Sequence, residues 1–316
     1  MSGFSLIELM VSMALGLFLT IIAFTLYSST AEIYAQNEQS ATLLEDTRYA
    51  MQLLSSELKM TGFYGNVTSP TDVDDTEMDD ASMITTDCGT LDDKATWAFD
   101  LDPPVETLSY ASQGEVITTY PCIDAAEVTS SGMILAIKRV LGTEQAFADL
   151  DNGSVYVGGT GTSGTLFHMD VATADLGADY TYWEYAVSIF YVDDSSGTPM
   201  LYRKVLQSGT PNTMTTESSP VAEGVERLHV TFGIDSDDDG SANYYLSTPT
   251  DTERETAVSA RIFILSRSLD ADTDYTNTKT YVLGDTSVGP FNDNYYRKVF
   301  STTVMLRNPR NYMTST

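Results

Sequence analysis

The densest cluster of side chains that could do chemistry lies in the stretch IDSDDDGSANYY. This stretch carries three aspartates at alternate positions, Asp235, Asp237 and Asp239. Gly240, which allows a tight turn, and Asn243 follow them. Alternate carboxylates of such a turn can converge on one Ca²⁺ ion, which prefers hard oxygen ligands. The bidentate Glu of a complete calcium loop is missing, because Leu246 occupies its place. The pattern predicts either a Ca²⁺ site completed from elsewhere in the chain or a solvated hairpin turn.

A second acidic run, LDADTDYTN, repeats the alternation at Asp270, Asp272 and Asp274 but lacks the glycine that permits the sharp bend. It is the weaker metal candidate. Most other carboxylates are expected to form a solvated surface, since 45 acidic residues stand against 16 basic ones and the formal charge is −29. A body this acidic repels phosphate backbones, so no direct partner among nucleic acids is expected.

The sequence offers no catalytic constellation. His229 alternates with strand residues in RLHVTF, and His168 in LFHMD has no nearby nucleophile or metal-ligand motif. The glycine-rich stretch GGTGTSGT lacks the lysine of a phosphate-binding loop and is interpreted as a flexible loop. We therefore expect a protein that is not an enzyme, has no catalytic residues and requires no cofactor, with Ca²⁺ as the one candidate ligand.

The chain contains two cysteines, Cys88 and Cys122. In an exported domain, an isolated pair of this kind usually forms a disulfide, which here would staple one long loop. Two buried free thiols are the alternative. Without a neighbouring histidine, two cysteines do not make a zinc site.

The N-terminus holds a carboxylate in an unusual place. The run from Phe4 to Leu26 is apolar except for Glu8, and as a helix it spans about 34 Å, enough to cross a bilayer. A carboxylate in hydrocarbon costs roughly 2.5–3.5 kcal/mol on insertion scales. Either Glu8 reaches the membrane interface, or it pairs with a cation at the same depth. Cleavage between Gly3 and Phe4 would create such a cation, a free α-amino group.

The helical pattern continues beyond Leu26, with apolar residues at helical spacing as far as Leu58, and Gly62 supplies a natural stop. From about residue 66 to 129 the composition is rich in Asp, Thr, Ser and Pro and predicts an irregular segment. Further on, β-branched and aromatic runs separated by turn residues predict strands, with a hairpin turn at Asp194–Gly197. These runs occupy 133–140, 154–159, 185–192, 200–206, 227–234, 260–268, 279–284 and 298–307.

The N-terminal stretch GFSLIELMVSMALG resembles the class III signal of type IV pilins and of type II secretion pseudopilins. The resemblance implies that a prepilin peptidase cleaves after Gly3 and methylates Phe4. It also implies that Glu8 pairs with the N-terminal amine of a neighbouring subunit during assembly. The stretch departs from the family in carrying no Lys or Arg before the cleavage site and no Pro in the apolar run.

Four later stretches resemble the PilW-type minor pilins in their order along the chain. They are LLEDTRYAMQLLSSELKMTGFYG, FYVDDSSGTPMLYRKV, VAEGVERLHVTFGIDSDDDG and FSTTVMLRNPRN. Many relatives carry a cysteine where this chain has Asn66, so their disulfide pattern is not transferred. The resemblance implies a pilin-like α+β fold, in which one very long N-terminal helix packs on an antiparallel β-sheet that carries a large irregular insertion. The expected parts are a leader (1–3), a transmembrane half-helix (4–28), a soluble half-helix (29–64), a disulfide-stapled insertion (65–132) and a sheet domain (133–316).

The resemblance further implies a minor pilin that primes or caps a type IV pilus. Its partners would be other minor pilins and the major pilin through the N-terminal helix, the prepilin peptidase, the inner-membrane assembly platform, and the lipid bilayer before assembly. The expected location is the inner membrane, in a single pass with the C-terminal domain in the periplasm, and then the pilus at the cell surface. The alternatives are a pseudopilin of a type II secretion system and a membrane-anchored, calcium-dependent adhesin that does not polymerise.

Overall fold

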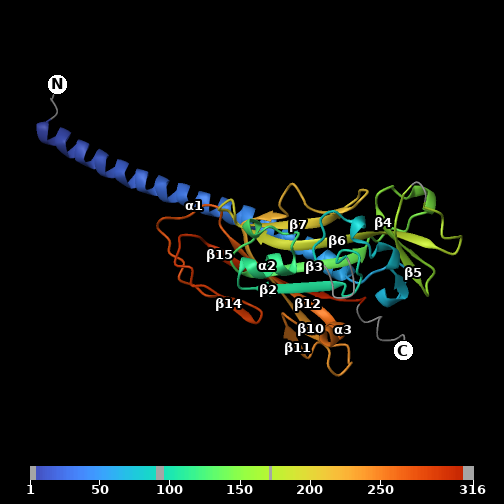
Figure 1. Ribbon diagram of the computed structural model, residues 1–316. Helices are drawn as coiled ribbons and strands as arrows, with labels where there is room; N and C mark the ends of the chain where they lie inside the picture. The colour runs from blue at the N-terminus through green and yellow to red at the C-terminus, as the bar shows by residue number, and fades with distance from the viewer. Residues whose placement is uncertain (1–4, 90–95, 171–172, 309–316) are drawn as a thin grey trace. The chain divides into compact units, whose positions relative to one another are not determined.

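The computed structural model describes residues 5–89, 96–170 and 173–308. The chain divides into two compact units, Met1–Glu45 and Asp46–Thr316. Helix α1 (Leu6–Met60) runs through both as one continuous element (Figure 1). It ends where Gly62 adopts a φ of +68°, a left-handed conformation that favours glycine. The prediction of one very long N-terminal helix with its stop at Gly62 is confirmed.

The larger unit is built mainly from strands. In Figure 1, β2, β3, β6 and β7 lie side by side. The strands are β1 (Val73–Asp74), β2 (Val105–Tyr110), β3 (Gly132–Val140), β4 (Val155–Gly159), β5 (Gly164–His168), β6 (Thr181–Asp193), β7 (Met200–Gln207), β8 (Thr213–Thr216), β9 (Ala222–Glu223), β10 (Val225–Ile234), β11 (Tyr244–Leu246), β12 (Ala257–Arg267), β13 (Tyr281–Leu283), β14 (Thr286–Val288) and β15 (Arg297–Met305). In the part of the chain that the structure describes, two short helices, α2 (Gln113–Thr119) and α3 (Asp251–Glu255), complete the regular elements apart from single 3₁₀ turns.

The strands form three sheets instead of the one expected. The first has nine strands, with the order β1-β5-β4-β6-β3-β2 and with β7, β8 and β9 attached beside β6. The second has the order β11-β10-β12-β15, and β13 pairs with β14 in the third. Apart from the parallel β1–β5 pair, the strand pairs of the described residues are antiparallel. The α+β class is confirmed.

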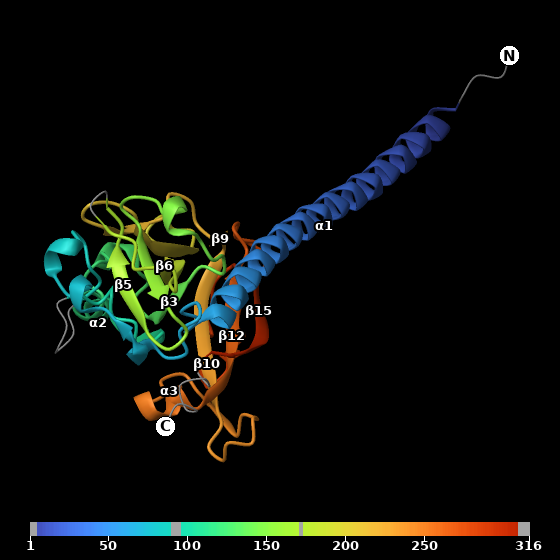
Figure 2. The ribbon, with the colours of Figure 1, turned by 90° about the vertical axis from the view of Figure 1, so that its right-hand side faces the viewer.

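The last turns of α1 lie against β10, β12 and β15 (Figure 2). Ala50, Leu54 and Leu58 point from the helix into a core shared by both large sheets, and each is at most 1% exposed. A buried hydrogen bond of 2.7 Å between the hydroxyls of Thr47 and Ser266 fixes the helix on β12. The helical spacing of these apolar residues is what gives the helix its buried face.

A second core lies on the opposite face of the nine-stranded sheet, under the segment that the sequence predicts to be irregular. This segment contains β2 and α2, which the prediction did not include. Its buried residues include Trp97, Tyr120 and both cysteines. Cys88 and Cys122 form a disulfide with a Cα–Cα distance of 4.6 Å, as predicted from their isolation in the sequence.

Candidate functional site

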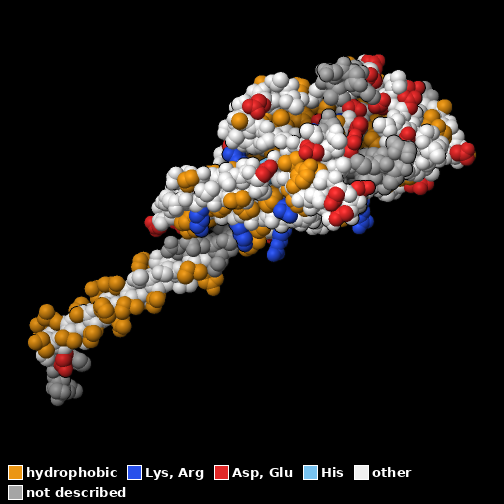
Figure 3. Space-filling view, turned by 90° about the horizontal axis from the view of Figure 1, so that it is seen from below, with side chains coloured by type: hydrophobic (Ala, Val, Ile, Leu, Met, Phe, Trp, Pro, Cys, Tyr) orange, Lys and Arg blue, Asp and Glu red, His pale blue; other side chains and the backbone are white. Residues whose placement is uncertain are grey.

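The first candidate site is the apolar start of α1. Residues Leu6–Thr30 form a helical stretch of 25 residues that is long and apolar enough to cross a membrane. Figure 3 shows hydrophobic side chains along this stretch, and Leu19 and Phe24 are 66% and 71% exposed. Its hydroxyl side chains donate to the backbone carbonyl four residues earlier, which satisfies them within the helix. These side chains are Ser12, Thr20, Thr25 and Thr30.

Glu8 lies in the first turn of this helix. Its carboxylate accepts the backbone N–H of Ser5 at 3.1 Å, while its own N–H donates to the Ser5 carbonyl at 3.0 Å. A Ser followed three residues later by Glu is the spacing of a capping box, so sequence reasoning could have found this local role. Among the described residues, no cation lies within ion-pair distance of Glu8. Gly3 and Phe4, the predicted cleavage and methylation positions, lie outside the described residues.

The second candidate site is the loop from Asp235 to Asn243, which connects β10 to β11 as a hairpin. Ligand atoms of Asp235, Asp237 and Asp239 lie within 4.8 Å of one another. Asp235 is only 4% exposed, and its carboxylate accepts the N–H groups of Asp239 at 3.2 Å and Gly240 at 2.7 Å. The three carboxylates fit the donor chemistry of a hard divalent cation.

The same loop also has a structural explanation. Gly240, with a φ of +91°, makes the bend, and Asn243 Oδ1 accepts hydrogen bonds from the N–H and the hydroxyl of Ser236 at 2.7 and 3.0 Å. The hairpin that the sequence left as the alternative is therefore present. Calcium binding by the loop stays a prediction.

The second acidic run forms a turn beside tyrosines. The carboxylate of Asp272 accepts the N–H of Asp274 at 3.0 Å and the hydroxyl of Tyr296 at 2.7 Å. The ring of Tyr296 stacks on Tyr275 with centroids 4.1 Å apart. In the described part of the chain, Asp270, Asp272 and Asp274 do not form a cluster of three neighbouring ligand groups. A metal there also remains a prediction.

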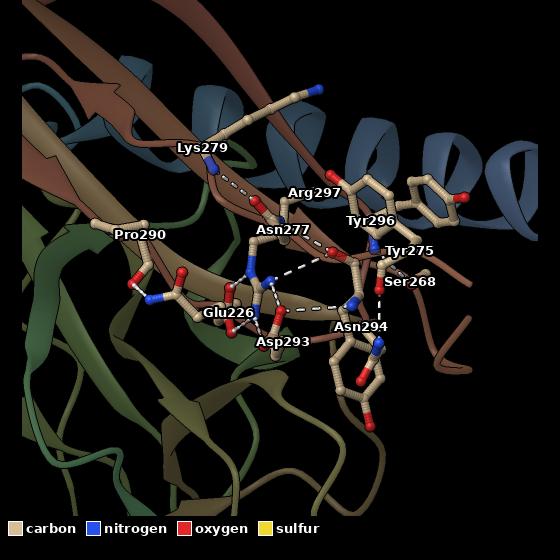
Figure 4. Close-up of polar contacts among 12 residues, drawn as sticks. Glu226, Ser268, Tyr275, Asn277, Lys279, Pro290, Asp293, Asn294, Tyr296 and Arg297 are labelled. Carbon is tan, nitrogen blue, oxygen red and sulfur yellow. Dashed lines mark hydrogen bonds and ion pairs between the residues drawn. The ribbon is translucent and has the colours of Figure 1, made fainter. Parts of the chain in front are cut away.

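A buried arginine anchors this region to the sheet (Figure 4). The side chain of Arg297 is 1% exposed and donates to both carboxylate oxygens of Glu226, at 2.6 and 2.9 Å, and to both of Asp293, at 2.6 Å each. Its guanidinium also lies 3.7 Å from the ring centre of Phe291. Burial alone would lower the pKa of Arg297, but its hydrogen bonds to Asp293 and Glu226 outweigh burial and raise it. Sequence reasoning missed this cluster, because Glu226 and Arg297 are 71 positions apart.

A buried lysine occupies the core beneath the disulfide-stapled segment. Lys138 is 1% exposed, lies 3.2 Å from Glu106 and has its ammonium 4.4 Å from the ring centre of Trp97. Glu106 also accepts from Trp97 Nε1 at 3.0 Å and from the Tyr120 hydroxyl at 3.2 Å. These contacts hold the segment on β2 and β3. They also occupy the carboxylate of Glu106 with hydrogen bonds and an ion pair, which is a structural role.

Neither histidine lies in a catalytic arrangement within the described part of the chain. His229 Nε2 lies 2.7 Å from Asp285 Oδ1, and His168 Nε2 lies 2.8 Å from the Gly209 carbonyl oxygen. Burial raises the pKa of Asp285, but hydrogen bonds from Ser247 and His229 outweigh it, so the pKa is lowered overall. Both histidines connect strands to neighbouring loops.

One part of the chain matches a known protein family. Residues 189–308 match the model of the family described as Type IV Pilus-assembly protein W, a range well under half of the chain. No curated protein matches the chain. Among solved structures, the chain is similar to a type IV-like pilin from Thermus thermophilus, at 10% identity and a TM-score of 0.38, over 84% of this chain and 97% of that one. The family match confirms the predicted resemblance over residues 189–308 and supports a type IV pilus-related pilin.

Proposed function

We propose that the protein is a minor pilin that takes part in type IV pilus assembly, where it primes or caps the filament together with other minor pilins. One observation carries the proposal. Helix α1 begins as an exposed apolar stretch with a carboxylate in its first turn and ends inside the core of a strand-rich unit that contains the family match. A plain membrane anchor needs neither the carboxylate nor the continuous helix.

Glu8 gives assembly an energetic reason. In a lone subunit its carboxylate is held in an apolar segment at a cost of roughly 2.5–3.5 kcal/mol. Cleavage after Gly3 would give Phe4 a free amine, and the amine of a neighbouring subunit could then pair with Glu8. Assembly would remove the cost and would bury the apolar side chains of Leu6–Thr30 against other helices.

The partners follow from this arrangement. The lipid bilayer would cover the apolar helix before assembly, and other minor pilins and the major pilin would cover it afterwards. A prepilin peptidase would process the chain, and the inner-membrane assembly platform would extract it, with the strand-rich unit on the periplasmic side. No cofactor and no catalytic residue take part. The match to a pilus-assembly family favours the pilus over a secretion pseudopilus.

N-terminal mass analysis of the mature protein tests the processing step. We expect a chain that begins at a methylated Phe4. Replacing Gly3 with Leu should leave the precursor uncut, whereas Ser2→Ala should be processed normally. A mature wild-type chain that keeps residues 1–3 would contradict the proposal.

Shearing separates the pilus from the pseudopilus. We expect the wild-type chain in surface filaments sheared from cells, next to the major pilin. If the chain stays in the membrane while secretion fails in its absence, the pseudopilin alternative is correct.

A further inference from the structure

The sheet β11-β10-β12-β15 ends in the long strand β15, and among the described residues no strand pairs with its second edge, which we call the open edge. In Figure 2, β15 is the outermost strand beside β12. It pairs with β12 through nine consecutive residue pairs, from Ser259↔Met305 to Arg267↔Arg297, without a register shift. The other end strands of the described sheets, such as β2 with six residues and β11 with three, are shorter.

The ladder shows which backbone groups of β15 face outward. The N–H of Ser268 donates to the Tyr296 carbonyl at 2.8 Å, and the N–H of Leu306 donates to the Val258 carbonyl at 3.0 Å. In an antiparallel ladder the N–H and C=O of one residue face the same neighbour, so even-numbered residues of β15 bond to β12. The odd-numbered residues direct their backbone groups to the open edge. These are Arg297, Val299, Ser301, Thr303 and Met305.

The usual protections of an edge strand are missing from the middle of β15. Neither a proline nor a bulge interrupts it, and residues 299–306 carry no charge. Ser301, Thr303 and Met305 are exposed, with Met305 at 60%. A long, straight and uncharged edge of this kind is a template for another strand.

The charges at the ends of the edge indicate what kind of strand fits. Exposed Lys298 and Arg307 flank the uncharged middle. β12 and β15 contain no acidic residue, although the whole chain carries 45 of them. An added strand with carboxylates at its ends would complement these cations.

We propose that the open edge of β15 binds, by strand addition, an extended segment of a neighbouring subunit that carries acidic residues at its ends. The assignment of the partner as a subunit of the same assembly rests on the proposed function. The addition would satisfy the outward N–H and C=O groups of β15 in the partner's backbone, and Lys298 and Arg307 would fix its register.

Photo-cross-linking in cells that express the full-length chain tests this proposal. A photoreactive p-benzoylphenylalanine placed at Met305 should cross-link to another pilin-type chain, within an extended segment that contains Asp or Glu. Mass spectrometry of the cross-linked peptide identifies the segment. A cross-link to β15 of a second copy, or no cross-link at all, would overturn the proposal.

Ser301→Pro removes an outward N–H without touching the ladder to β12, because proline lacks that group and is tolerated at edges. We expect it to lower the cross-link yield about tenfold, and the matched variant Ser301→Val to leave the yield unchanged. Equal yields from the two variants would contradict strand addition. Formation of the Cys88–Cys122 disulfide checks that each variant folds.

Charge reversal provides a second test that does not depend on a proline. The double variant Lys298→Glu and Arg307→Glu should also lower the yield about tenfold, whereas Lys298→Arg should not. An unchanged yield after charge reversal would overturn the acidic character of the partner. Sheared filaments are scored separately. A chain that is absent from filaments but still gives the edge-dependent cross-link would refute the proposed function and leave the edge inference standing.

Discussion

The two halves of helix α1 differ in where their apolar side chains find partners. In the C-terminal half, Ala50, Leu54 and Leu58 are buried by strands of the same chain. In the N-terminal half, apolar side chains such as Leu19 and Phe24 are mostly exposed. The C-terminal half is part of a folded core, whereas the N-terminal half stays exposed, and we propose that lipid or other helices cover it.

The acidic residues of the helix show the same contrast. Glu57 is 3% exposed, accepts two hydrogen bonds from Arg139 at 2.8 and 2.9 Å, and lies 3.8 Å from Arg203. Glu8 has the Ser5 N–H as its contact. The carboxylate of Glu57 is neutralised when the chain folds, whereas among the described residues no cation lies within ion-pair distance of Glu8.

The largest effect on folding is expected at Glu57. Glu57→Ala leaves the guanidinium of Arg139 without its buried counter-charge, so the free energy of unfolding should fall by about 3 kcal/mol or more. Urea unfolding in detergent measures it. Glu8→Ala is the matched control and should leave the unfolding midpoint unchanged. Equal urea midpoints for Glu57→Ala and wild type would contradict the difference proposed between Glu57 and Glu8.

Leu54→Ala tests the packing of the buried half. It removes a side chain that is 0% exposed and leaves a cavity, so we expect a loss of about 3 kcal/mol. Leu19→Ala, in the exposed half, should change the unfolding free energy by less than about 0.5 kcal/mol. A similar loss for both variants would mean that the two halves are not distinct.

A smaller effect on the free energy of unfolding is expected at Asp293, which binds the buried guanidinium of Arg297 just before β15. Hydrogen bonds from Arg297 lower the pKa of Asp293 despite some burial. The stabilisation is therefore complete above the unfolded pKa and is lost as the pH falls through the lower folded value, in a window below about pH 4. Asp293→Asn should flatten the acid limb of the stability curve by about 1 kcal/mol, because the carboxylate is partly exposed. An identical acid limb in both proteins would argue against the anchor.

The smallest effect concerns the loop from Asp235 to Asn243. If it binds Ca²⁺, millimolar calcium should raise the melting temperature by about 2 °C relative to a chelator. Asp237→Asn should abolish the shift, whereas Asp274→Asn, in the other acidic run, should keep it. A melting curve that does not respond to calcium would contradict calcium binding and would mean that the aspartates of this loop serve only the hairpin turn.

Much of the fold could be predicted from local patterns. The apolar spacing up to Leu58 and the glycine at position 62 define the helix, and the β-branched runs correspond to the long strands. The predicted hairpin turn is present, with the Gly197 N–H donating to the Asp194 carbonyl at 2.9 Å. These elements could be predicted because the sequence patterns that indicate them lie within a few neighbouring residues.

Other features depend on distant residues and could not be predicted in this way. The composition of GGTGTSGT predicts a flexible loop, yet Gly159 and Gly164 pair across β4 and β5. A Cβ on Gly159 would collide with the side chain of Asn66, so the glycine is required by close packing and not by flexibility. The Arg297 cluster and the position of Lys138 beside Glu106 likewise arise from tertiary contacts.

We propose that the exposed half of α1 finds its partners in other subunits. The most direct test compares wild type with Glu8→Ala in cells, by measuring how much of the chain is in the membrane and how much in sheared filaments. We predict equal membrane levels and a strong loss of the variant from filaments. Equal amounts of both proteins in filaments would contradict the account.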